Sequence, residues 1–249
     1  MGRILYVWRR ELGQAFGSPV ALVSIAVFVC VQAGLFYWIG YPIGPVPLPS
    51  LWDGGQASLT VPFTWQPLLL ALLVPALCMG AWAEERRAGT EELLFTYPLR
   101  TGEVVLGKWL GAWTLVTLML LLGTLPLAWA VDGIGDLDWA TVWVGLVGAS
   151  SLAAAYCALA LCCSAISSEQ LVAFLIGALL LGVLWGLRLL VSILPAQYAG
   201  VLDAMCPASH MLDSATRGVL DLRDTVYFAS LVLVGLVLNS VLVERRRWV

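Results

Sequence analysis

The feature that most limits the fold of this chain is a repetition of long apolar segments. Six such segments are each close to the ~20 residues that a helix needs to cross a bilayer. They lie at about residues 20–40, 66–83, 108–131, 141–166, 171–194 and 225–243. Charged residues make up 12% of the chain, against roughly 25% in a soluble domain. The six segments also take up most of the 249 residues, so we expect no separate soluble domain. The sequence predicts an all-α integral membrane protein with six transmembrane helices in one domain, 1–249.

Charge alternates between the polar stretches that separate these segments. The N-terminus, the stretch 84–108 and the C-terminus are rich in arginine, whereas the remaining long loops are rich in aspartate. Basic residues collect in the cytoplasmic loops of membrane proteins. We therefore expect a multi-pass protein of the bacterial cytoplasmic (inner) membrane with both termini and 84–108 in the cytoplasm. The basic residues do not form a stripe along the chain, so we expect no nucleic-acid partner.

The stretch 84–108, EERRAGTEELLFTYPLRTGEVVLGK, is the most informative of the polar loops. After the charged run it holds a breaking glycine, a capping threonine, two acids in the first turn of a short helix and an apolar triplet: Gly89, Thr90, Glu91, Glu92, Leu93, Leu94 and Phe95. Thr101 is expected to cap the next helix. Exposure of an apolar triplet to water is unfavourable, so we expect these side chains to be buried against lipid or protein. The triplet either rests on lipid headgroups or inserts into another protein, and the residues alone leave both alternatives open.

The run E-E-R-R-x-G-T-E-E-L-L-x-T-x-P, followed by L-G-K-x-L-G, resembles the first cytoplasmic loop of type-2 ABC exporter permeases. The ending, R-G-V-L-D-L-R-D-T-V-Y-F and then E-R-R-R-W, is most similar to gliding-motility-type permeases. A nitrous-oxide-reductase accessory permease is the next closest branch, because the loop run L-x-T-Y-P-L also resembles it. The resemblance implies that 84–107 is a coupling loop with a coupling helix that contacts an ATPase. The residues implied in ATPase coupling are Glu84, Glu85, Gly89, Thr90, Glu91, Glu92, Leu93, Leu94 and Phe95.

The same resemblance implies the partners and the cofactors. The chain would pair with a second permease, either another copy or a companion, and with an ABC ATPase dimer, all in the lipid bilayer. ATP and Mg²⁺ would bind to the ATPase, and no cofactor, metal or catalytic residue is expected on this chain. The implied function is a permease subunit that couples ATP hydrolysis to outward substrate movement. The alternative is an ATPase-driven membrane module for envelope or motility assembly that transports no solute.

Three further segments have expected structures. Residues 1–19 form an amphipathic helix, which matches the interfacial elbow helix of the family. The segment 41–65 is rich in proline and glycine and is expected to be irregular. The outer loop 195–224 has short apolar stretches, and the resemblance implies short re-entrant helices there.

Two basic residues call for a choice between readings. The run from Gly102 to Lys108 matches the start of a phosphate-binding P-loop, but Trp109 replaces the required Ser or Thr, and no strand precedes it. We therefore expect no ATP hydrolysis on this chain and do not classify it as an enzyme. Arg188 lies inside the fifth apolar segment, where a charge is costly. It either extends to the outer headgroups or lies on a translocation path or a dimer seam.

Overall fold

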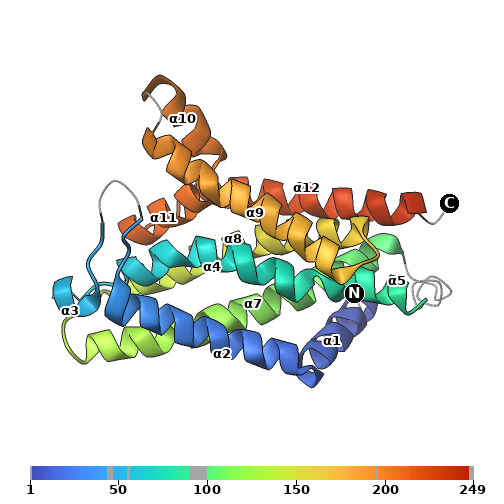
Figure 1. Ribbon diagram of the computed structural model, residues 1–249, viewed down its shortest axis with the longest axis horizontal. Coiled ribbons are helices and arrows are strands. Elements are labelled where there is room, and N and C mark those ends of the chain that lie inside the picture. The colour runs from blue at the N-terminus through green and yellow to red at the C-terminus, as the bar shows by residue number, and fades with distance from the viewer. Residues whose placement is uncertain (1, 44–46, 55–56, 90–99, 194–195, 247–249) are drawn as a thin grey trace.

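The computed structural model describes residues 2–43, 47–54, 57–89, 100–193 and 196–246 (Figure 1). Six helical segments in this part are long and apolar enough to cross a membrane, which confirms the predicted all-α fold and the six spans. The chain is therefore a multi-pass membrane protein. The spans are α2 (Pro19–Gly34) with the π-helix η1 (Leu35–Ile39), α4 (Thr60–Cys78) with α5 (Gly80–Arg87), α7 (Thr101–Asp132), α8 (Trp139–Ile166), α9 (Gln170–Ile193) and α12 (Leu222–Arg246).

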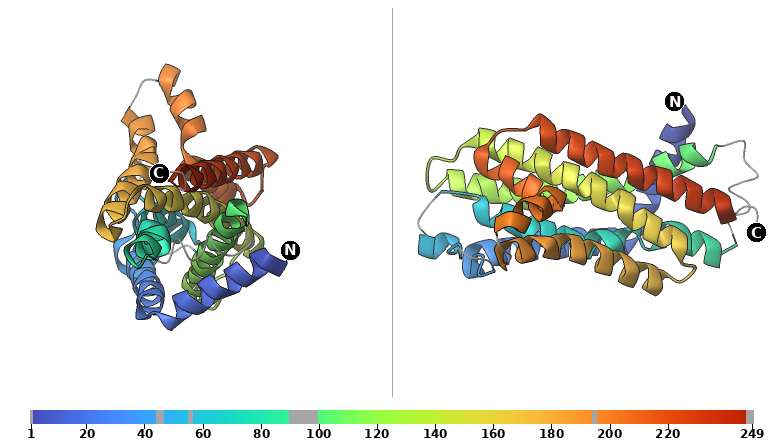
Figure 2. Two further views of the ribbon diagram at one scale, coloured as in Figure 1. Left: turned by 90° about the vertical axis from the view of Figure 1, so that its right-hand side faces the viewer. Right: turned by 90° about the horizontal axis from the view of Figure 1, so that it is seen from above.

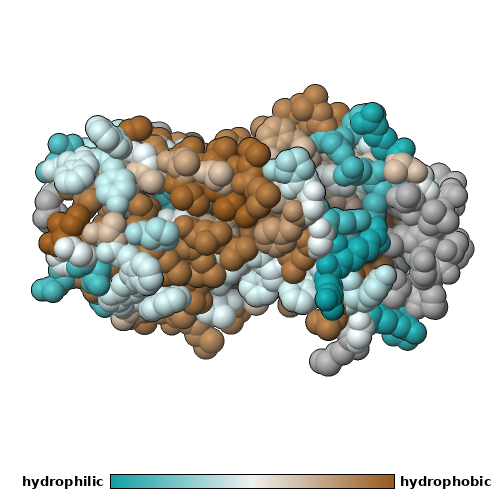
Figure 3. Space-filling model, turned by 90° about the horizontal axis from the view of Figure 1, so that it is seen from below, coloured by the Kyte–Doolittle hydropathy of each residue, from teal (hydrophilic) through white to brown (hydrophobic). Residues whose placement is uncertain are grey.

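The spans lie side by side, and the start of α1 (Gly2–Gly17) and the end of α12 are at the same end of the bundle, the N/C end (Figures 1 and 2). The loops before α4 and α8 lie at the opposite end, the far end. On the face seen in Figure 3, hydrophobic side chains cover the middle of the bundle, and hydrophilic ones gather toward its two ends. This distribution suits a bundle whose middle lies in lipid.

Helix α8 is the centre of the bundle. It packs against α4, α7, α9, α11 and α12, and small residues such as Ala153, Ala155 and Ala158 are fully buried along it. Helix α12 approaches so closely that a Cβ on Gly235 would lie 2.8 Å from the Cβ of Ala158. Small side chains at such crossings let helix backbones pack tightly in lipid, where no hydrophobic force drives them together.

The segment 41–65 is more ordered than the sequence suggests. A short helix, α3, spans Leu51–Gly54, and α4 begins at Thr60 instead of near residue 66. The prediction of an irregular segment was therefore wrong for residues 51–54 and 60–65. Pro62 is compatible with this start because the first-turn N–H groups of a helix have no helical partner. The indole of Trp65 donates to the Gly40 carbonyl (2.7 Å), which ties the loop to α4.

The N-terminus of α8 at the far end and that of α7 at the N/C end show how helices of this bundle are capped. Asp138 caps α8, accepting from the Thr141 hydroxyl (2.6 Å) and the Ala140 N–H (3.0 Å); these hydrogen bonds hold the pKa of its carboxyl below the ordinary value. At α7 the prediction of Thr101 as the cap was wrong. Thr101 is already helical, and the Glu103 carboxylate reaches back to the N–H of Arg100 (3.0 Å), as in a capping box.

The segment 195–224 contains two short helices, α10 (Ala196–Met205) and α11 (Pro207–Arg217). Helix α10 projects from the bundle beside the end of α9 (Figure 1), whereas α11 is mostly buried against α8, α4 and α9. Cys206, between them, is fully buried, and its thiol donates to the Leu184 carbonyl (3.7 Å). A positive φ of 65° at Gly218 ends α11.

Candidate functional site at the junction of α1, α5 and α7

The N/C end holds the first part of the predicted coupling loop. Of the residues implied in ATPase coupling, Glu84, Glu85 and Gly89 belong to the described part, and the other six, 90–95, lie outside it. Glu84 is exposed, whereas Glu85, on the next position of α5, turns toward the bundle. Gly89 has a φ of 67° and its N–H donates to the Arg86 carbonyl (3.0 Å), so the breaking glycine indeed follows the end of a helix.

Helix α1 crosses the start of α7 at two glycines. A Cβ on Gly107 would lie 2.6 Å from the Cβ of Val7, and a Cβ on Gly111 would lie 2.8 Å from that of Glu11. Real Cβ atoms do not approach so closely, so both positions require glycine at this crossing. The indole of Trp8 also donates to the Thr114 hydroxyl (3.3 Å). The two glycines thus bring α1 close to α7, and Glu11 lies beside Lys108, the residue that follows Gly107.

Lys108 is the only lysine of the chain, and it is buried, with 2% of its side chain exposed. Its ammonium donates to Oε1 of Glu85 (2.9 Å), Oε1 of Glu11 (3.2 Å) and the carbonyl of Ala81 (2.8 Å). It also lies 5.0 Å from the centre of the Trp82 ring, within the range of a cation–π contact. An ammonium has three donors, and here each has an acceptor.

A second cation completes the group. Arg10 of α1 donates to the same Oε1 of Glu85 (3.4 Å). The junction cluster, which we define as Arg10, Glu11, Glu85 and Lys108, therefore contains two cations and two carboxylates. It joins three segments that are far apart in the sequence, and its charges compensate one another, as burial requires.

The other side of α5 is fixed to the last turn of α8 and to the residue that follows it. The Ser164 hydroxyl donates to the Met79 carbonyl (2.8 Å) and accepts from the N–H groups of Trp82 and Ala83 (3.1 and 3.4 Å). Arg86 donates to the Ser167 carbonyl (3.2 Å). The base of the predicted coupling loop is thus held by α1, α7 and α8 together.

Sequence reasoning missed the junction cluster. Lys108 counted only as one of the basic residues of the loop, and Glu85 as a residue that meets the ATPase. The available signal was the single lysine among 13 basic residues, placed between Gly107 and Gly111. The structure also shows why the P-loop match has no function: Gly102 to Lys108 form the first turns of α7, and a continuous helix offers no phosphate-binding loop.

Arg188 lies near the far end of α9. Its Nη1 atom is buried and has no hydrogen-bond partner. Tyr41, on the loop after the first span, is its electrostatic neighbour: burial raises the pKa of the Tyr41 hydroxyl, and the positive charge of Arg188 opposes that rise. The buried Nη1 shows that the guanidinium is shielded, at least in part, by the protein itself.

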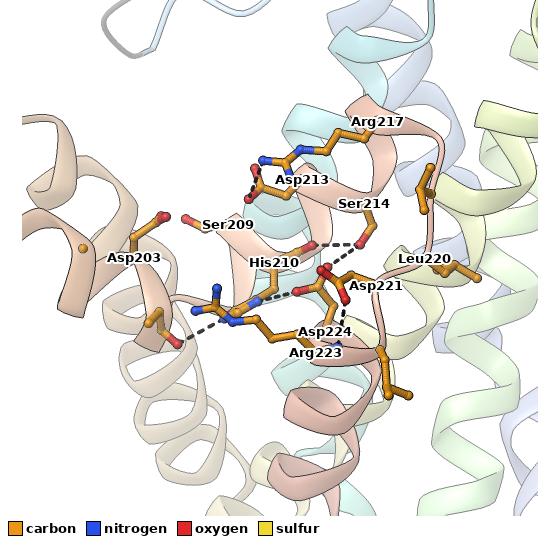
Figure 4. Close-up of a pocket in the computed structure, with 14 residues that line it drawn as sticks. Asp203, Ser209, His210, Asp213, Ser214, Arg217, Leu220, Asp221, Arg223 and Asp224 are labelled. Carbon is orange, nitrogen blue, oxygen red and sulfur yellow. Dashed lines mark hydrogen bonds and ion pairs between the residues drawn. The ribbon is translucent and has the colours of Figure 1, made fainter.

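A cavity of about 400 Å³ lies at the far end, between α10, α11 and the start of α12 (Figure 4). His210 lines it, and its Nδ1 pairs with Asp224 (2.6 Å) and its Nε2 with the Ala204 carbonyl (3.1 Å). The Ser214 hydroxyl donates to Asp224 (2.8 Å) and not to the imidazole, so the serine is not activated as in a hydrolase triad. Among the described residues, no group of metal-ligating side chains is assembled.

Comparison with known proteins bears on this geometry. A family model described as "ABC-2 family transporter protein" matches residues 49–238. The chain belongs to this family. The match begins before α3 and runs into α12, so it includes α5, the predicted coupling loop and α7. The expectation of a type-2 ABC permease, drawn from the loop residues, is therefore confirmed at the level of the family.

Two curated relatives of this ABC-2 family member carry the name "Probable ABC transporter permease protein NosY". The protein from Stutzerimonas stutzeri is 31% identical over 150 residues, which cover 56% of this chain and 51% of the relative. The protein from Pseudomonas aeruginosa is 33% identical over 120 residues, covering 47% and 42%. The chain thus spans about half the length of the curated relatives it matches.

Proposed function

We propose that the chain is the transmembrane permease subunit of an ABC exporter, driven by a separate ATPase subunit. ATP and Mg²⁺ bind to a dimer of that ATPase, and a second permease, identical or a companion, completes the membrane part. The membership in the ABC-2 family and the six spans support this assignment. The positions of the arginines favour the bacterial inner membrane, with the N/C end in the cytoplasm.

The observation that carries the proposal is the junction cluster. Helix α5 leads into the predicted coupling loop and α7 follows it, and Lys108 bonds both to Glu85 of α5 and to Glu11 of α1. A partner that pushes on this loop therefore acts on α4 through α5, and on α7 and α1 through buried ion pairs. The amphipathic α1 then serves as an elbow helix that moves with the third span.

The apolar triplet Leu93, Leu94 and Phe95 is the proposed point of contact with the ATPase. Covering such side chains in a partner groove stabilises a complex by roughly 1.5–3 kcal/mol each. Replacing all three with serine should therefore cost several kcal/mol, and the ATPase should be lost during purification. The membrane fold should survive, because none of the three lies in a span.

A matched control exists at the far end, where Val219, Leu220 and Leu222 are all exposed. The same triple replacement with serine there should leave co-purification of the ATPase unchanged. If a well-inserted variant of the loop triplet retains the ATPase, the docking role is wrong. The alternative, a loop that rests on the lipid headgroups, would then apply.

Reconstitution separates the exporter from the alternative, a non-transporting module for envelope or motility assembly. Proteoliposomes that contain the permease and its ATPase should hydrolyse ATP faster when a transported solute is added. The opposite result has two parts: ATP hydrolysis depends on the permease but responds to no solute, and no solute moves in an ATP-dependent way. This result would favour the non-transporting module.

Arg188 is proposed to lie on the translocation path or on the seam between two permeases. The buried Nη1 supports this over simple extension to the headgroups, because an Arg that only snorkels would place its guanidinium in water.

A further inference from the structure

Three polar side chains meet inside the bundle, in the half near the far end. Gln32 of α2, Gln66 of α4 and Thr124 of α7 are each fully buried, with 0% of their surface exposed. Each lies about two turns, or roughly 10 Å, from the far end of its span. Uncharged polar groups at this depth have no solvent to bond with, so their hydrogen bonds must be made inside the protein.

The hydrogen bonds between the three side chains involve only the NH₂ group of each glutamine amide, not its oxygen. Nε2 of Gln66 and Nε2 of Gln32 both donate to the Thr124 hydroxyl, at 3.0 and 3.4 Å. Oε1 of Gln32 and Oε1 of Gln66 are buried and have no partner. Oε1 of Gln32 lies over Gly123, where a Cβ would come within 2.8 Å of it. The same Cβ would lie 2.6 Å from the Phe28 ring, so glycine at position 123 is what lets Gln32 and Phe28 of α2 approach the backbone of α7 this closely.

The main chain of α4 adds one more acceptor nearby. Pro67 follows Gln66 and has no N–H, so the carbonyl of Phe63, four residues earlier, lacks its helical donor. Carbonyls freed by proline within membrane helices are commonly bonded by side chains or ordered water. The proline thus leaves a main-chain carbonyl without its helical donor in the same half of α4 that carries Gln66.

We propose that Gln32, Gln66 and Thr124 hold a bound water molecule between α2, α4 and α7. Water donates two hydrogen bonds, which is the number that the two amide oxygens require. If an amide turns over, its NH₂ group faces the same space, and water accepts that bond equally well. A monovalent cation cannot accept a bond, and none of the three side chains carries a charge to balance it.

Nuclear magnetic resonance of the detergent-solubilised chain, with ¹⁵N only in glutamine side chains, tests the site directly. Gln32→Met and Gln66→Met assign the two signals. A resident water gives cross-peaks from water to both amides, opposite in sign in laboratory-frame and rotating-frame experiments, whereas chemical exchange gives the same sign in both. The exposed Gln14 serves as the control and should show exchange alone.

Each outcome bears on the proposal. Loss of the water cross-peak at Gln32 in the Gln66→Met variant supports one shared water. Absence of cross-peaks at both amides in the unsubstituted chain, which needs no variant to fold, means a dry site and overturns the proposal. A saturable shift of both signals when choline is replaced by sodium or thallium ions also overturns it, in favour of a cation.

Discussion

Lys108→Met should destabilise the protein more than the loss of any surface charge. The substitution keeps a long unbranched side chain but removes a buried ammonium that bonds to Glu85, Glu11 and the Ala81 carbonyl. Removal of one partner from a buried ion pair costs about 3–5 kcal/mol, because the other charge stays buried. Glu85 keeps Arg10, and the two carboxylates are 13% and 17% exposed, so we expect the low end of this range, about 3 kcal/mol.

The measurement is a reversible unfolding titration of the purified chain in mixed micelles. Arg217→Met is the matched control, because Arg217 is 73% exposed and its pair with Asp213 spans 3.8 Å; exposed pairs contribute about 0–1 kcal/mol. The double variant Lys108→Met with Glu85→Gln should lose less than the sum of the single losses, since it removes both charges of one pair.

The result that refutes this reasoning is a loss in Lys108→Met no larger than in Arg217→Met. The junction cluster would then be screened by solvent and could not transmit force from the loop. A loss of the expected size, with single and double variants strictly additive, would show that Lys108 matters for packing and not for its charge.

Three further outcomes are expected. Gly107→Ala should cost about 1–3 kcal/mol by pushing α1 away from α7 at Val7. Gly182→Ala, whose added Cβ would meet nothing within 4 Å, should cost nothing in micelles, and equal effects of the two variants in thermal unfolding would contradict the close crossing. Asp138 has a lowered pKa, so its cap stabilises α8 at neutral pH, and this contribution disappears as the pH falls from about 4 toward the folded pKa. Asp138→Asn should remove that part of the pH dependence, and an unchanged acid-unfolding profile would contradict the assignment. Arg188→Leu should insert normally but uncouple ATP hydrolysis from the permease, and Arg188→Lys should retain part of the coupling; full coupling in both variants would assign Arg188 to the headgroups.

The sequence by itself determined the class of fold and the six spans. Their lengths and apolar composition suffice, because lipid allows a lone segment of this kind only one structure, a helix that bonds its own backbone. Local signals also placed the break at Gly89. Where prediction failed, as at Thr60, the reason was that proline is tolerated in a first helical turn but reads as a breaker in sequence.

The tertiary structure alone decided which polar residues meet. Glu11, Glu85 and Lys108 are separated by 74 and 23 positions in the chain, and no local pattern predicts their contact. The same holds for Gln32, Gln66 and Thr124, which read as isolated polar residues in apolar helices until α2, α4 and α7 pack together. Helix formation depends on neighbours within a turn or two, whereas ion pairs and buried hydrogen bonds depend on how helices cross, and glycines such as Gly107 set that crossing only once a partner helix is present.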